Sequence, residues 1–208
     1  MSKSKNYKVY NGKKLKSIYE NSRIYLLVLL FAIGIIVGSI NINRNNIITD
    51  DLKLIVDSFT DLRSGQGISG IFFNSFLMNG IFVLINLFLA FSLIGYPLIL
   101  FIPFLKGLGI GALSGYLYSS FGFLGLGYSL LIIYPGAVVS AFALVNACND
   151  SCEYSKNSFN KSILGKGVFE KNETKIMLIR QLVFIGVTAL SSLIDALVSI
   201  GFSRFFEI

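Results

Sequence analysis

One apolar block, Ile71–Ala147, constrains this chain more than any other feature of its sequence. From Ile71 to Asn149 the only ionisable side chain other than tyrosine and cysteine is that of Lys106. A membrane-crossing helix needs roughly 20 apolar residues, so the block is long enough for three crossings joined by tight turns. Charged residues make up only 14% of the whole chain, against about 25% in soluble proteins. The sequence therefore predicts a polytopic membrane protein.

Basic residues predict the direction in which the chain crosses the membrane. Residues 1–23 and 148–180 are rich in Lys and Arg, whereas residues 41–70 contain only Arg44, Lys53 and Arg63. Cytoplasmic segments carry the excess of Lys and Arg, which places the first two segments inside and 41–70 outside. Two cytoplasmic segments require an even number of spans between them. With one span before residue 41, three between residues 70 and 148 and a last one after residue 177, we predict five spans, a cytoplasmic N-terminus and an extracytoplasmic C-terminus.

The predicted fold class is all-α, a polytopic membrane helical bundle with five transmembrane helices and a short extracytoplasmic amphipathic helix. We expect one membrane domain, residues 24–202, after a basic cytoplasmic segment, residues 1–23. An external insert covers residues 41–70 and a cytoplasmic loop covers residues 148–177. The five spans are expected at about residues 24–40, 74–94, 97–118, 124–147 and 178–200.

The external insert contains an amphipathic stripe. Apolar residues recur there at helical spacing, at Ile48, Leu52, Ile55, Phe59 and Leu62. Two interpretations remain open. Leu52, Ile55, Phe59 and Leu62 form a partner-binding surface, or the helix packs on its own bundle or on the membrane surface.

Glycines at helical spacing predict close contact between helices. Gly107, Gly111 and Gly115 share one helix face, and Gly34 and Gly38 repeat the spacing in the first span. Membrane helices associate where small residues let their backbones approach. The pattern fits tight packing inside the bundle or a homodimer seam, and also fits a cavity or passage lined by small residues.

Two charged residues, Lys106 and Asp195, lie in otherwise apolar stretches. A charged side chain inside a membrane is costly and usually faces a partner or water. One hypothesis is that the two approach each other across the bundle. The alternative places Lys106 at the cytoplasmic turn between the second and third spans, and Asp195 near the outer interface.

The composition gives no sign of catalytic or metal chemistry. The chain has no histidine, which removes the usual general base and the commonest metal ligand. Cys148 and Cys152 alone are too few ligands for a metal site. We expect no enzyme activity, no cofactor and no metal. The net charge of +7 lies beside the apolar spans, so we expect a lipid bilayer rather than nucleic acid as the partner of the basic residues.

The order of these segments resembles the stage II sporulation protein M family over roughly residues 20–200. The resemblance rests on NSRIYLLVLLFAIGIIVGSI as the first span, followed by an acidic, amphipathic insert. It continues through FFNSFLMNGIFVLINLFLAFSLIGYPLILF, FIPFLKGLGIGALSGYL and LLIIYPGAVVSAFALVNA. Many relatives carry Pro-His-Gly and a following Glu in the fourth span. Tyr134-Pro135-Gly136 has no histidine and no Glu follows, so chemistry based on those groups is not carried over.

The resemblance implies a membrane scaffold that positions peptidoglycan hydrolases of the sporulation engulfment machinery in the cell membrane. The implied partners are sporulation proteins D and P, which cut peptidoglycan. A second hypothesis is a transport or lipid-handling protein acting as a dimer. It is motivated by Lys106, Asp195, the glycine-rich helix and Pro135, because transporters place interrupted helices and charges at the bilayer midplane. A water-filled cavity reaching Lys106 would favour this second hypothesis, and a dry packed bundle would not.

Overall fold

A computed structural model describes residues 22–42, 67–92, 94–162 and 171–202 of the chain. The first helix is Ser22–Ile42, and it is followed by α3 (Ile68–Phe91) and α4 (Gly95–Tyr128). A short π-helix, η1 (Ser129–Ile133), leads directly into α5 (Tyr134–Ser162), and α6 (Lys171–Phe202) completes the bundle. The described residues contain no strand, which confirms the all-α prediction. The apolar stripe of the insert, from Ile48 to Leu62, lies outside the described residues.

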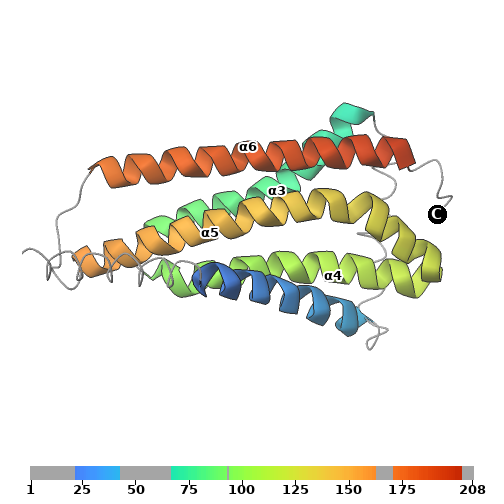
Figure 1. Cartoon of the computed structure of the whole chain (residues 1–208), viewed down its shortest axis with the longest axis horizontal. Coiled ribbons are helices and arrows are strands. Elements are labelled where there is room, and N and C mark those ends of the chain that lie inside the picture. Colours follow the sequence, from blue (N-terminus) through green and yellow to red (C-terminus); the bar gives the residue numbers. More distant parts are fainter. Residues whose placement is uncertain (1–21, 43–66, 93, 163–170, 203–208) are drawn as a thin grey trace, which may run out of the picture.

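Four helical segments in the described part of the chain are long and apolar enough to cross a membrane: Ser22–Ile42, Ile68–Phe91, Gly95–Ser162 and Asn172–Phe202. The third is 68 residues long and reverses its direction, so that α4 and α5 run side by side as a hairpin (Figure 1). Gly122 has φ +59° and ψ −132° at the bend, a conformation that glycine adopts without a Cβ clash.

Helix bounds differ from the predicted span bounds in several places. The structure begins α3 at Ile68, inside the range that the sequence assigned to the external insert. It continues α5 to Ser162 and begins α6 at Lys171, so both helices run through parts of the predicted cytoplasmic loop. A helix does not have to end where the apolar residues end, because its backbone hydrogen bonds are internal to the segment.

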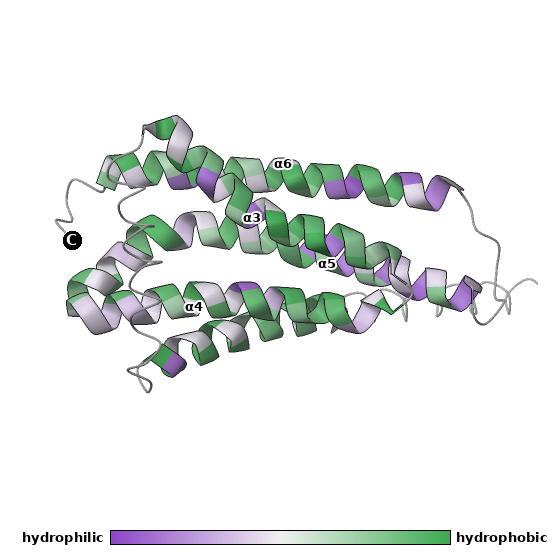
Figure 2. Ribbon diagram, turned by 180° about the vertical axis from the view of Figure 1, so that it is seen from behind, coloured by the Kyte–Doolittle hydropathy of each residue, from purple (hydrophilic) through white to green (hydrophobic). Residues whose placement is uncertain are grey.

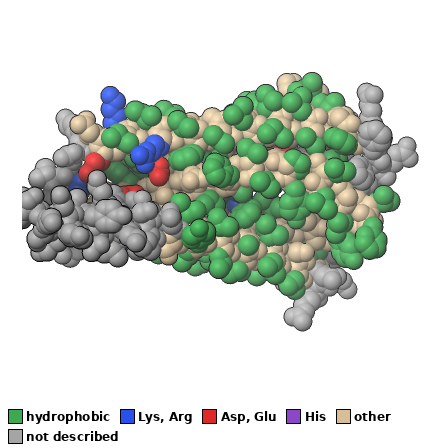
Figure 3. All heavy atoms as spheres, viewed as in Figure 1, with side chains coloured by type: hydrophobic (Ala, Val, Ile, Leu, Met, Phe, Trp, Pro, Cys, Tyr) green, Lys and Arg blue, Asp and Glu red, His purple; other side chains and the backbone are tan. Residues whose placement is uncertain are grey.

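The surface of the bundle is apolar, and much of its polar content is inside. Large apolar side chains are exposed on every helix, among them Phe88 (77%), Phe123 (86%) and Leu182 (66%). Apolar side chains cover the middle of the molecule (Figure 3), and hydrophilic residues gather where α5 ends and α6 begins (Figure 2). Soluble monomers rarely expose contiguous apolar patches of such extent. This distribution is the one that a surrounding bilayer stabilises.

Two clusters of buried side chains form the apolar core. One contains Leu27, Val83, Ile99 and Leu144 and joins the first helix to α3, α4 and α5. The other contains Tyr116, Leu117, Tyr128 and Ile132 and fills the inside of the α4–α5 bend. The bend is therefore packed on its inner side as well as held by the backbone of Gly122.

The first helix and α4 approach each other through their glycines. A Cβ atom built on Gly34 or Gly38 would lie 2.3 Å from a backbone oxygen of α4. A Cβ atom on Gly107 or Gly111 would lie 2.2 or 2.1 Å from a backbone oxygen of the first helix, and one on Gly115 would lie 2.9 Å away. These distances leave no room for a side chain. Both backbones are therefore in direct contact over two helical turns.

This contact predicts that alanine substitutions at two glycines of α4 differ sharply in their effect on stability. We expect Gly111→Ala to lower the free energy of unfolding by about 1–3 kcal/mol, the usual cost of overpacking, because its methyl group meets the backbone of Ile35. Gly109→Ala is the matched control, since nothing lies within 4 Å of the added Cβ. Thermal unfolding of both variants in one detergent measures the difference. Equal midpoints for the two variants would contradict the backbone contact.

Candidate functional site: a polar interior

A row of polar side chains on one face of α3 forms the centre of the candidate site. Ser75, Asn79 and Asn86 point inward together with Phe82, at steps of four, three and four residues. This spacing keeps all four on the same side of a helix. The neighbours α4, α5 and α6 each bring a polar or charged side chain to this face, as the hydrogen bonds below show.

Lys106 lies within α4, and its side chain is buried, with only 4% exposed. Its Nζ donates a hydrogen bond to Asn79 Oδ1 at 2.9 Å and lies 5.7 Å from the centre of the Phe82 ring. An ammonium over an aromatic face gains a cation–π attraction in addition to the hydrogen bond. The turn between α3 and α4 lies earlier, at Ser92–Ile94. The lysine therefore faces the interior of the bundle from the body of a helix.

Asp195 lies within α6 and is 7% exposed. Its Oδ2 accepts a hydrogen bond from Ser75 Oγ at 3.1 Å. A Cβ atom on Gly136 would lie 2.1 Å from Asp195 Oδ1, so the carboxylate rests directly on the backbone of α5. One turn earlier on α6, Ser191 Oγ donates to the Gly136 carbonyl at 2.7 Å. These contacts hold α6 against the start of α5, next to Pro135 and the π-helix.

Lys106 and Asp195 face the same side of α3 in the interior of the bundle. Their hydrogen bonds both go to α3, through Asn79 and Ser75, which lie one helical turn apart. The two charges stood out in the sequence, whereas these α3 partners were missed. The signal that could have found them was the i, i+4 spacing of two polar residues in an otherwise apolar span.

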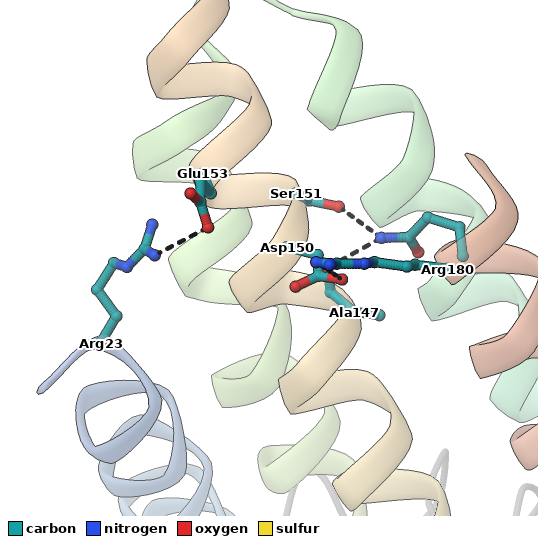
Figure 4. A network of polar contacts seen from close by, with 7 residues as sticks. Arg23, Ala147, Asp150, Ser151, Glu153 and Arg180 are labelled. Atoms are coloured by element: carbon teal, nitrogen blue, oxygen red, sulfur yellow. Dashed lines mark hydrogen bonds and ion pairs between the residues drawn. The ribbon is translucent and has the colours of Figure 1, made fainter. Parts of the chain in front are cut away.

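A second polar group joins α3, α5 and α6. Asn86 Nδ2 donates to Ser151 Oγ at 2.8 Å, and Gln181 Nε2 donates to the same oxygen at 3.0 Å and to the Ala147 carbonyl at 3.0 Å. Figure 4 shows Ser151 and Ala147 of α5 beside the neighbouring ion pairs. Asn86 and Ser151 have no exposed surface, and Gln181 is 1% exposed. Interhelical hydrogen bonds of this kind fix how helices are rotated against one another.

Ion pairs lie at the end of the bundle where the first helix begins. Arg23 and Glu153 join the first helix to α5 with an Nη2–Oε2 distance of 3.5 Å (Figure 4). Arg180 and Asp150 join α6 to α5 with an Nη1–Oδ2 distance of 3.5 Å. A third pair, Lys161 with Glu173, joins α5 and α6 close to the end of α5 and the start of α6. Each of the acids Asp150, Glu153 and Glu173 thus has its own cation.

The arrangement holds the helices together. No group of three or more potential metal-ligating side chains occurs among the described residues. Cys148 and Cys152 are free thiols buried in the core. A cavity of about 270 Å³ lies between α5 and α6 at the ion-pair end, and another of about 380 Å³ lies beside the α4–α5 bend. Neither is lined by Lys106 or Asp195.

The neighbouring contacts of Lys106 and Asp195 on α3 predict that the two residues are coupled. We expect Lys106→Ala and Asp195→Ala each to cost about 3 kcal/mol of unfolding free energy, because each leaves a buried charge without its counterpart. The double variant should cost less than the sum by at least about 1 kcal/mol. Unfolding in a mixed-micelle titration gives all three values. Lys161→Ala, which removes one member of a more exposed pair, is the control and should cost less than about 1 kcal/mol. Strict additivity of the two interior variants would rule out the coupling.

Comparison with known proteins gives one match. A sequence model of the stage II sporulation protein M family matches residues 27–200. The matched range begins inside the first helix and ends inside α6, so it contains the glycine contact and both interior charges. No curated protein and no solved structure matches the chain.

Proposed function

This chain belongs to the stage II sporulation protein M family, and from that premise we propose that it is a scaffold for peptidoglycan hydrolases in the cell membrane during engulfment. Family membership makes it a sporulation-related membrane protein of a generally non-catalytic kind. In its proposed role the bundle anchors the hydrolases and holds them at the membrane that borders the wall.

The observation that carries the proposal is how the interior polar groups are used. Lys106, Asp195 and Gln181 all bind side chains of other helices, and the two cavities lie away from both charges. A passage for solutes needs interior polar groups that face water or substrate. A platform needs its interior polar groups to hold its own helices in place, and the polar groups of this bundle do so. The hydrogen bonds from these groups to other helices therefore favour a scaffold over transport.

Five crossings are part of the proposal, with α4 and α5 as separate spans. The ion pair of Arg23 and Glu153 brings the start of the first helix to the end of α5, which fits four crossings between them. Arg180 pairs with Asp150 at the same end, so α6 starts there and a fifth crossing carries the C-terminus to the opposite side. The cluster of basic residues makes this end the cytoplasmic one.

The topology predicts where reporters fused to the chain will be active. A phosphatase that works only outside the cytoplasm should be active after Phe202 and inactive after Ser162. A fluorescent protein that folds only in the cytoplasm should show the reverse at the same two positions. A cytoplasmic C-terminus would disprove the five-span arrangement.

The partners are proposed to be sporulation proteins D and P, held through the external insert. Its apolar residues Leu52, Ile55, Phe59 and Leu62 supply the contact surface, in an insert that lies on the wall side of the membrane. If the same stripe instead docks the insert onto the bundle, substitutions in the stripe should lower the stability of the protein and leave partner binding intact.

Substitutions in the insert separate these two roles. We expect Phe59→Asp with Leu62→Asp to reduce co-purification of the hydrolases from sporulating cells at least about tenfold, because charges replace the apolar contact. Asp57→Asn, on the polar side of the same stripe, is the control and should leave co-purification unchanged. The unfolding midpoint should be the same in all three proteins. Undiminished co-purification after scrambling residues 48–62 would refute the proposed contact.

A further inference from the structure

We propose that the cavity beside the α4–α5 bend binds the headgroup of a neutral glycolipid, a diacylglycerol that carries an uncharged sugar. The cavity has a volume of about 380 Å³ and lies between the first helix, α4 and η1. Sites for small ligands usually measure about 300–1,000 Å³. It lies at the opposite end of the bundle from Arg23, because Ser39 is near the end of the first helix and Ser129 follows the bend at Gly122. The proposed topology, on which this inference rests, puts it in the outer half of the bilayer.

The lining combines a largely apolar surface with hydroxyl groups, which suits an uncharged ligand that has both apolar parts and hydroxyl groups. Five of them carry a hydroxyl group: Ser39, Ser114, Tyr118, Ser129 and Tyr134. None of the lining residues is charged. A phosphate buried here would have no cation to pair with, and phosphate recognition usually depends on Arg or Lys. A sugar needs only hydrogen bonds, which hydroxyl groups supply.

The hydrogen-bonding capacity of these hydroxyl groups is only partly used. Ser114 Oγ donates to the Ile110 carbonyl at 2.9 Å, and Ser129 Oγ donates to the Gly125 carbonyl at 3.0 Å. Both serine oxygens keep lone pairs that can accept a bond from a ligand. The phenol groups of Tyr118 and Tyr134 form no hydrogen bond in the described part of the chain and can both donate and accept. Sugar hydroxyl groups also do both, so they complement the whole set.

The mouth of the cavity faces the surface that lipid covers. Leu126 and Leu130 belong to the lining and are 41% and 57% exposed on the apolar outside of the bundle. A lipid lying along these side chains can place its acyl chains against them and its headgroup among the hydroxyl groups. A water-soluble sugar would have to cross that apolar rim. The geometry therefore points to a ligand that arrives from the bilayer.

The bend itself creates the cavity. The chain reverses at Gly122, and the π-helix η1 is wound more widely than an α-helix. Together these two features bring Ser129 and Leu130 back towards the first helix. Single π-helical turns inside α-helices occur frequently at functional sites. Here the π-helix lies between the bend and Pro135, and it contributes a polar and an apolar group to the same wall.

Native mass spectrometry of the full chain tests the site. The protein is reconstituted with equal amounts of glucosyl-diacylglycerol, phosphatidylglycerol and phosphatidylcholine of identical acyl chains, and the lipids retained after detergent transfer are counted. We expect the wild type to retain one glucosyl-diacylglycerol in preference to the other two. The double variant Tyr118→Phe, Tyr134→Phe keeps both rings and should bind it about tenfold more weakly, as expected for the loss of two neutral hydrogen bonds.

Tyr116→Phe is the matched control, because Tyr116 is buried close by but does not line the cavity. It should bind the glycolipid as the wild type does. Equal retention of the three lipids, a preference for phosphatidylglycerol, or an equal loss in Tyr116→Phe would overturn the proposal. The same variants are scored for hydrolase co-purification. Wild-type protein that captures the hydrolases but retains the three lipids equally would reject the lipid site alone. Wild-type protein that prefers the glycolipid but captures no hydrolase would reject the scaffold alone.

Discussion

Direct contact between the backbones of the first helix and α4 is the constraint on which the rest of the bundle depends. Inside a bilayer, apolar side chains gain little by leaving lipid for one another, so helices associate through close packing and interhelical hydrogen bonds. Gly34, Gly38, Gly107 and Gly111 have no side chain at the points where the two backbones approach most closely. The rotation of α4 about its axis is then fixed. That rotation points Lys106 at Asn79 of α3 and away from lipid.

Helix α3 connects the remaining helices because its polar residues all face inward. Ser75 binds α6, Asn79 binds α4, and Asn86 binds α5. Each bond requires a particular rotation and height of its partner helix. Buried polar groups contribute modestly to stability once satisfied, but leaving one unsatisfied costs about 1–3 kcal/mol. Alternative packings that break several such bonds are therefore disfavoured.

A fixed arrangement of this kind suits a platform. Ion pairs tie the first helix and α6 to α5 at one end, while Asp195 and Ser191 tie α6 to Gly136 towards the other. Between them the interior hydrogen bonds are made within the chain. A protein that holds enzymes at a membrane gains from rigidity, because the position of its partners is then set by its own fold. The hydroxyl-lined cavity beside the bend would add a lipid to that platform without disturbing the interior contacts.

The sequence by itself determined the all-α class, the membrane setting and the family. Long apolar runs have few other solutions, because every backbone polar group in a bilayer must be satisfied within a helix or a closed barrel. Glycine spacing and two isolated charges also stood out in the sequence. Only the tertiary structure decided their partners, because a spacing shows which residues share a face and not which face lies opposite. Ser75, Asn79 and Gln181 looked ordinary until α4, α5 and α6 were placed beside them. The cavity at the bend likewise needs three segments, distant along the chain, to meet in space.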